Sequence, residues 1–181
     1  MFDSVPASRS LGEILALASG LAWAVAVILF RISGRKVHPI GLNLAKTVLA
    51  LAVMVPTLLV LGEPLAPAVP ATTTGLLLLS GILGIAISDT LFFYALNRLG
   101  ASLTAIVDCF YTPFVIALSF VLLGERLTFV QLAGAALVVS AILTLSKEGK
   151  LEKIDRKDLA LGVLYGILAM FFVAFGIVMV K

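Results

Sequence analysis

The sequence predicts an all-α membrane protein, a polytopic bundle of transmembrane helices. The chain has 181 residues, of which 61% are hydrophobic, and its mean hydropathy is +1.19. Only 13% of the residues are charged, whereas soluble domains usually carry about 25%. The apolar residues form runs of about 20, the length that a helix needs to cross a bilayer. A chain of this length accommodates about six such spans.

Polar and proline-rich loops separate the first three spans. Residues 11–30 form the first apolar run, which ends at the cation Arg31 and is followed by a basic loop. Residues 40–61 form the second run, and residues 74–96 form the third. The loop between these two runs contains three prolines, which exclude a regular helix there (Pro64, Pro67 and Pro70).

Glycine turns separate the next two spans. The fourth span, residues 101–123, begins after a tight turn at Gly100, and the fifth, residues 128–145, begins after a second glycine turn. Thr128 and Gln131 have the spacing of a capping box. This pair therefore predicts the start of the fifth helix.

The last apolar segment, residues 159–180, resembles the first. With the two segments in register, Gly12 aligns with Gly162 and Arg31 aligns with Lys181. Many transporters consist of two copies of a helical repeat. We therefore expect a complete five-helix repeat, a charged linker and the first helix of a second, truncated repeat (residues 11–146, 147–158 and 159–181).

Three ionisable side chains, Lys46, Asp89 and Asp108, lie well inside apolar spans. A charge near the bilayer centre costs about 2.5–3.5 kcal/mol, so such residues usually face a partner or a watery cavity. The depth of each residue can be counted along its helix, at roughly 1.5 Å per residue, from loops that share one face of the membrane. All three residues then lie about 10–13 Å deep. Contact among them is geometrically possible, and we expect a charged cluster that lines a pathway.

A polar stripe follows one face of the fourth span. Thr104, Asp108, Tyr111 and Thr112 have i, i+4, i+7 and i+8 spacing, which places them on the same side of a helix. A polar stripe on a membrane helix is expected to face the protein interior. Pro113 is expected to kink this helix and to leave a carbonyl free beside Asp108.

The buried polar residues have two interpretations. In the first, Lys46 neutralises the aspartates only so that the helices insert and pack. In the second, the cluster binds substrate or couples transport to an ion, since an aspartate in an apolar site can take up and release a proton. Trp23, in mid-span, is expected to form a cavity wall or a packing contact. The candidate substrate-binding or ion-coupling residues are Trp23, Asn43, Lys46, Asp89, Asp108, Tyr111 and Thr112.

Several classes of protein do not fit this sequence. One cysteine, Cys109, and one histidine, His38, are too few for a disulfide framework or a zinc site. No nucleophile–base set, metal-binding motif or phosphate-binding loop occurs, so we expect no enzyme activity, no metal and no cofactor. The basic residues gather in loops, as membrane topology requires, so the net charge of +3 does not indicate nucleic-acid binding.

The distribution of loop charges predicts an orientation. The loops between spans one and two, three and four, and five and six share one side and carry most of the Lys and Arg residues. The positive-inside rule then places the N-terminus outside.

Short motifs of the third, fourth and fifth spans and the opening of the first are distinctive in combination. They are Tyr94-Ala95-Leu96, Gly100-Ala101-Ser102, Pro113-Phe114, Leu123-Gly124-Glu125-Arg126-Leu127-Thr128, and Gly12 with Ala16-Leu17 and Trp23. Together they resemble the EamA repeat of the drug/metabolite transporter superfamily, over residues 11–145 with a second copy beginning at residue 159. The resemblance implies ten helices in two inverted repeats around a central cavity, and a cytoplasmic N-terminus, opposite to the charge count.

The resemblance also bears on the buried charges. Family members often carry a cation in the second helix, where Lys46 lies, whereas Asp89 and Asp108 fall outside the common pattern. These two aspartates are therefore candidates for residues that distinguish one subgroup of the family, or that recognise the substrate of that subgroup. Two acids, a lysine, a tyrosine and threonines suit a zwitterionic or amine-bearing molecule.

Two functions remain open at this point. The first is a secondary transporter that exports or exchanges small metabolites, amino acids or drugs, represented here by an N-terminal fragment. The second is a non-transporting helical membrane module, or a half-transporter that needs a partner to complete it. The expected partners are a small-molecule substrate, the lipid bilayer, and either the missing second repeat or a second copy. The expected location is the plasma membrane of a prokaryote.

Overall fold

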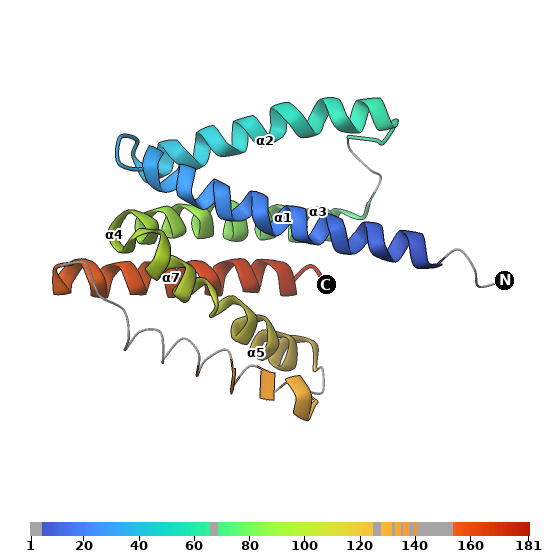
Figure 1. Ribbon diagram of the computed structural model, residues 1–181. Helices are drawn as coiled ribbons and strands as arrows, with labels where there is room; N and C mark the ends of the chain where they lie inside the picture. Colours follow the sequence, from blue (N-terminus) through green and yellow to red (C-terminus); the bar gives the residue numbers. More distant parts are fainter. Residues whose placement is uncertain are drawn as a thin grey trace.

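The computed structural model describes residues 5–65, 69–124, 128–131, 133–134, 136–137, 140 and 154–181. All regular elements in these ranges are helices, which confirms the predicted all-α class. Four helical stretches of the described chain are long and apolar enough to cross a membrane (Gly12–Ser33, Pro39–Leu61, Ala71–Asp108 and Arg156–Val178). Figure 1 shows them as a bundle, with α5 (Tyr111–Leu123) at its lower side.

The helices α1 (Val5–Ser33) and α2 (Pro39–Leu61) form one side of the bundle. Pro39 occupies the first turn of α2, where its fixed backbone angle suits a helix and no N–H is needed. The helix ends at Gly62, whose φ of 72° gives the left-handed conformation that commonly terminates helices. Both predicted spans are confirmed, and α1 extends beyond the predicted range at each end.

The third span contains a stretch of π-helix. It consists of α3 (Ala71–Gly81), the π-helical element η1 (Ile82–Ile87) and the first part of α4 (Ser88–Asp108). Such wide turns are rare and often occur at functional sites. The π-helix was not predicted, and it places Ser88 and Asp89 directly after an irregular segment.

The fourth span begins within α4, because this helix bends sharply at Gly100. The bend has φ 80° and ψ 171°, a conformation that glycine adopts without strain. It joins the end of the third span to the start of the fourth and confirms the predicted turn. The Thr104 hydroxyl donates a hydrogen bond of 2.8 Å to the Gly100 carbonyl and secures the new helical turn.

A second interruption divides the fourth span in its middle. The helix α4 ends at Asp108, and α5 (Tyr111–Leu123) begins three residues later. Hydrogen bonds to the third preceding residue replace the α-helical pattern across residues 109–110. Pro113 has no N–H to offer the carbonyl of Cys109, so the predicted break near this proline is confirmed.

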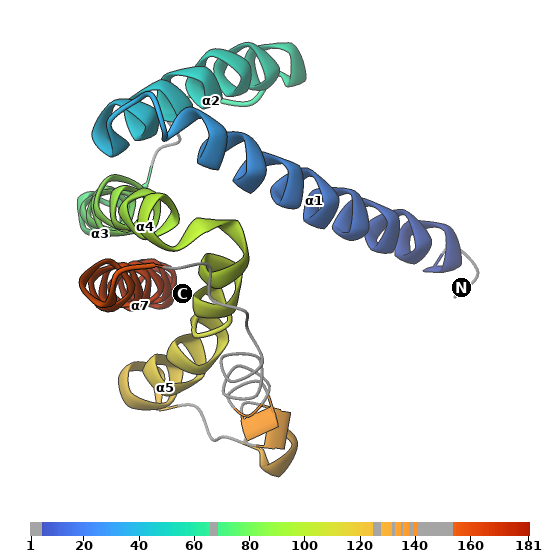
Figure 2. The ribbon, with the colours of Figure 1, turned by 60° about the vertical axis from the view of Figure 1, so that its left-hand side comes forward.

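The helix α7 (Arg156–Val178) packs closely along α4 and also contacts α3, η1 and α5; Figure 2 shows it beside α3 and α4. Glycines permit this approach: a Cβ at Gly166 would lie 2.6 Å from Cγ1 of Val107. A Cβ at Gly162 would likewise meet a leucine of α4 at 2.6 Å. These two glycines therefore serve close helix packing, whereas a Cβ at Gly20 or Gly81 would meet nothing within 4 Å among the described residues.

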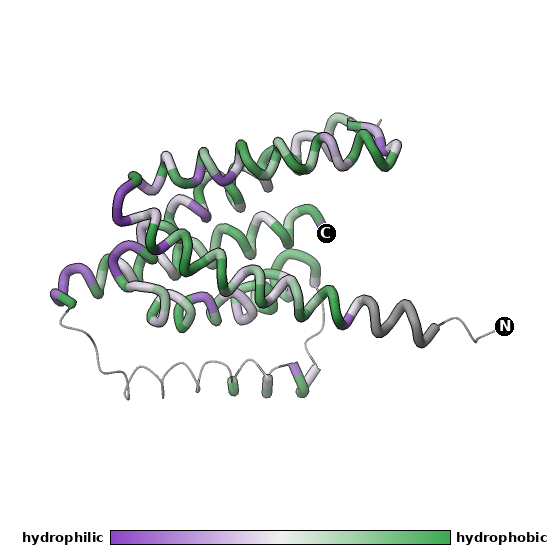
Figure 3. Tube along the Cα trace, turned by 45° about the horizontal axis from the view of Figure 1, so that its top comes forward, coloured by the Kyte–Doolittle hydropathy of each residue, from purple (hydrophilic) through white to green (hydrophobic). Residues whose placement is uncertain are grey.

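The buried core lies around α4, where Phe92, Phe93 and Leu96 meet α1, α2 and α7. In Figure 3, most of each described helix is hydrophobic, and hydrophilic residues gather at the α1–α2 turn and at the start of α7. Many apolar side chains of α1 and α2 point outward and are exposed. This pattern suits helices that contact lipid.

Half of the predicted fifth span lies outside the described residues (132, 135, 138–139 and 141–145). Its capping box is described: the Thr128 backbone N–H donates to Oε1 of Gln131 at 2.9 Å, and the Gln131 N–H donates to the Thr128 hydroxyl at 3.3 Å. This reciprocal pair confirms the predicted start of the helix. The division into a five-helix repeat, a linker and a further helix stays a prediction.

Candidate functional site

Three connecting segments meet at one end of the bundle. Arg31 donates a hydrogen bond of 2.6 Å to the carbonyl of Asn97, and the Asn97 amide donates one of 3.0 Å to the carbonyl of Gly34. Arg98 forms an ion pair with Asp158 at the start of α7. These contacts hold the α1–α2 turn, the bend in α4 and the N-terminal end of α7 together. The depths of Lys46, Asp89 and Asp108 were therefore counted from loops at a common end.

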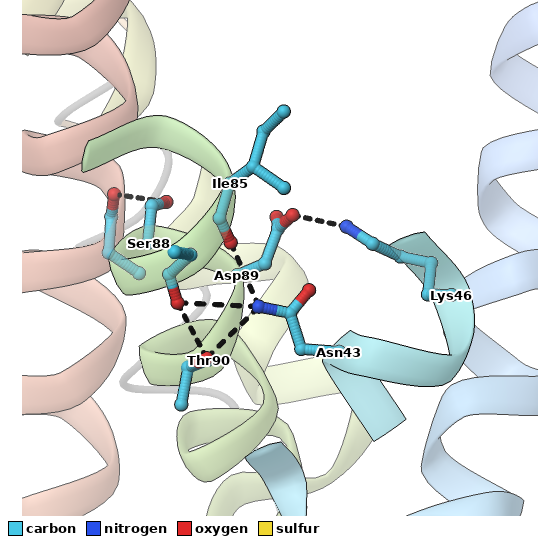
Figure 4. Close-up of polar contacts among 8 residues, drawn as sticks. Asn43, Lys46, Ile85, Ser88, Asp89 and Thr90 are labelled. Atoms are coloured by element: carbon cyan, nitrogen blue, oxygen red, sulfur yellow. Dashed lines mark hydrogen bonds and ion pairs between the residues drawn. The ribbon is translucent and has the colours of Figure 1, made fainter. Parts of the chain in front are cut away.

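Lys46 and Asp89 form an ion pair between α2 and α4 (Figure 4). Their side chains are 26% and 22% exposed, and the Lys46 ammonium also lies 5.9 Å from the centroid of the Phe93 ring. Each charge neutralises the other in apolar surroundings, where a lone charge would be costly. The predicted contact is thus formed by two of the three charged residues.

Asn43 lies one helical turn before Lys46 and contacts the π-helix. Its amide nitrogen lies 2.9 Å from the carbonyl of Ile85, 3.3 Å from that of Ala86 and 3.0 Å from the hydroxyl of Thr90; Figure 4 shows these contacts. The Asn43 side chain is buried. It therefore holds the wide turn of η1 against α2, and so positions Asp89 for its ion pair.

A cavity of about 380 Å³ lies between α1, α4, α5 and α7. Its polar groups include the carboxylates of Asp89 and Asp108, and its walls include the rings of Trp23, Phe92 and Tyr111. The Trp23 and Phe92 ring centroids are 5.9 Å apart. Apolar side chains of α7 complete the lining. The volume lies within the range of about 300–1,000 Å³ that is typical of small-molecule sites.

Asp108 does not join the ion pair. Its Oδ1 atom is buried and has no hydrogen-bond partner among the described residues. Asp108 shares the cavity with Asp89, whereas Lys46 is not among the cavity-lining residues. The expected cluster of three charges is thus a neutral pair, one member of which lines the cavity, together with a separate carboxylate.

The polar stripe of the fourth span is divided by the break at residues 109–110. Thr104 is buried against the α4 backbone, Asp108 and Tyr111 line the cavity, and Thr112 is exposed. The i+8 relation that grouped Thr112 with the others holds only for a continuous helix. The interruption changes the angular position, about the helix axis, of the residues that follow it, so Thr112 does not lie on the cavity side.

Sequence reasoning missed the apolar half of the cavity. Phe92 of α4 and Met170, Val173 and Ile177 of α7 form much of its wall. The close approach that Gly162 and Gly166 permit was the available signal that α7 packs on α4. An apolar side chain that lines a cavity has the same chemistry as one in the packed core, so only the structure could identify these residues as cavity-lining.

Comparisons with known proteins bear on the same region. The family model described as the EamA-like transporter family matches residues 10–147. The matched segment includes Trp23, Lys46, Asp89 and Asp108, whereas α7 lies outside it. No curated protein and no solved structure matches the chain.

Proposed function

We propose that the chain moves small metabolites, amino acids or drugs as a secondary transporter. The chain belongs to the EamA-like transporter family, and it is thus a membrane transporter of the drug/metabolite transporter superfamily. The cavity between α1, α4, α5 and α7 is the proposed substrate site. The proposed setting is the plasma membrane of a prokaryote. In this proposal, the described helices belong to one five-helix repeat and the first helix of a second.

The observation that supports this proposal best is where the two carboxylates lie. Asp89 follows the π-helix η1, and Asp108 is the last residue of α4 before the break at residues 109–110. Both line one cavity. In transporters, interrupted helices supply the polar groups of the substrate or ion site, because regular membrane helices keep their backbone groups bonded internally. A purely structural ion pair would not require a second carboxylate in the same cavity that no cation of the described residues neutralises.

Each residue then has a distinct role in the proposed mechanism. Asp108 is the charged group that meets the substrate or coupling ion. Trp23 and Tyr111 form the walls against which the substrate body rests. Lys46 and Asn43 hold Asp89 and the adjoining π-helix, so they act by positioning and do not touch the substrate.

A flux measurement tests this function. The purified chain is reconstituted into vesicles, and uptake of a panel of labelled amino acids, amines and carboxylates is compared with that of empty vesicles. We expect at least one solute to enter faster than in empty vesicles, and Asp108→Asn to abolish that difference. Asp155→Asn is the matched control, because it makes the same chemical change at an exposed position just before α7.

Both possible failures are informative. If no solute enters faster than in empty vesicles, the chain does not transport by itself, as a non-transporting module or a half-transporter would not, and the proposed function is wrong. If Asp108→Asn transports as fast as the unaltered protein while inserting normally, the assignment of this carboxylate is wrong.

A further inference from the structure

The fixed charges around the cavity do not cancel. Lys46 and Asp89 neutralise each other, which leaves the carboxylate of Asp108, whose Oδ1 atom has no partner in the described part of the chain. A buried carboxylate oxygen without a partner is costly, and a cation beside it would lower that cost. The ionised cavity therefore has the electrostatic character of a site for a single positive charge.

The backbone around Asp108 contributes one helix end of each sign and one carbonyl without its helical partner. Asp108 is the last residue of α4, and the C-terminal end of a helix carries the negative end of its dipole. Pro113 cannot donate a hydrogen bond to the Cys109 carbonyl, so this carbonyl lacks its helical partner. Because α5 begins at Tyr111, its positive N-terminal end also lies near Asp108. The two helix ends offset each other, so the negative character of the site comes from the carboxylate and from the carbonyl without its helical partner.

The walls favour an organic cation over a metal ion. The rings of Trp23, Phe92 and Tyr111 line the cavity, and aromatic faces attract organic cations. A hard metal ion requires about six or more oxygen ligands. The polar side chains here are few, and two already have partners: the Ser88 hydroxyl donates to the Ala169 carbonyl at 2.9 Å, and Asp89 is paired with Lys46.

We propose that the transported substrate is an organic monocation with an apolar or aromatic body. This inference rests on the proposed transport function and names its substrate class. The amine or quaternary ammonium group lies beside Asp108, and the body lies between the aromatic rings and the apolar side chains of α7. A zwitterion or an anion would place a carboxylate beside Asp108, and no described cation other than the paired Lys46 is available near the cavity to offset it.

Three probes with one body test the inference. Benzyltrimethylammonium, phenylalanine and phenylacetate share a benzyl group and differ in the charge of the head, which is a cation, a zwitterion or an anion. Their binding to the solubilised chain is measured by equilibrium dialysis. Trp23, the only tryptophan in the sequence, lines the cavity, so its fluorescence reports whether a probe binds there.

We expect the cation to bind at least about tenfold more tightly than the other two probes and to change the fluorescence of Trp23. Asp108→Asn is expected to weaken binding of the cation by at least about tenfold, and Asp155→Asn to leave it unchanged. Equal binding of the three probes, no saturable binding of the cation, or unchanged binding by Asp108→Asn would overturn the inference. If Asp108→Asn does not fold, the comparison of probes on the unaltered chain decides alone.

The inference and the proposed function can fail separately. Flux of a neutral or anionic solute without binding of benzyltrimethylammonium would refute the substrate class and leave the transport function intact. Saturable, Asp108-dependent binding of the cation without flux of any solute would support the site and refute transport. If Asp108 serves only to carry a proton, the quaternary ammonium probe does not bind, and the inference is wrong.

Discussion

Replacing Gly166 by alanine tests the close packing that forms the cavity. The new Cβ would lie 2.6 Å from Cγ1 of Val107 and 3.3 Å from its Cβ, whereas ordinary contact begins near 3.4 Å. Val107 is β-branched and stiff about its first side-chain torsion, so it cannot swing aside. The helices α4 and α7 must therefore separate by several tenths of an ångström or more, directly beside Asp108.

The expected magnitude follows from two opposing effects. Overpacking a well-filled contact costs about 1–3 kcal/mol, and replacing glycine by alanine within a helix favours folding by about 0.5–1 kcal/mol. The net prediction for Gly166→Ala is a loss of about 0–2.5 kcal/mol of unfolding free energy. Gly20→Ala is the matched control, because a Cβ there meets nothing within 4 Å among the described residues; it should not lose stability.

Detergent-solubilised protein is unfolded with increasing SDS and followed by far-UV circular dichroism. The difference between the two variants is the decisive quantity, since both make the same chemical change in a helix. If Gly166→Ala is as stable as Gly20→Ala, then α4 and α7 do not approach as closely as described, and the geometry of the cavity wall is wrong.

Three further predictions concern the residues around the cavity. Lys46→Met and Asp89→Leu should each destabilise the protein by about 1–3 kcal/mol, which is less than the roughly 3–5 kcal/mol lost when a fully buried ion pair is broken. The double variant should recover most of this loss, because it leaves no unpaired charge. Additive losses in a double-mutant cycle would disprove the ion pair. Asn43→Leu should cost about 1–3 kcal/mol in the same SDS titration, because its contacts to two carbonyls of the π-helix and to the Thr90 hydroxyl disappear. Unchanged stability would mean that Asn43 does not hold this turn. Trp23→Ala should weaken binding of benzyltrimethylammonium, measured by equilibrium dialysis, by about 2–30-fold, because one ring contact to the cation is lost. Unchanged binding would show that Trp23 is not part of the site.

Apolar runs and turn residues were sufficient to predict most of the fold. The spans of α1 and α2, the bend at Gly100 and the break near Pro113 all depend on local chemistry, which is visible in a single segment. The π-helix could not be predicted, because Asn43 of another helix contacts its carbonyl groups. Local sequence does not contain that information.

The candidate site was predicted less completely than the fold. Depth counting brought Lys46, Asp89 and Asp108 to a similar level, but depth does not determine which aspartate the lysine reaches. That choice depends on how α2 packs against α4. Thr112 was grouped with Asp108 by a periodicity that the break at residues 109–110 interrupts. The apolar lining from α7 carries no chemical signature and became evident only from the packing of that helix.

The central claim is that substrate passes through the cavity at Asp108. Its most direct test is the ratio of initial uptake rates for Asp108→Asn and Asp155→Asn in reconstituted vesicles, with both variants matched for inserted protein. The account predicts that Asp155→Asn transports at the rate of the unaltered protein and that Asp108→Asn is slower by at least about tenfold, a loss of about 1.4 kcal/mol in transition-state stabilisation. Equal rates for the two variants would contradict it.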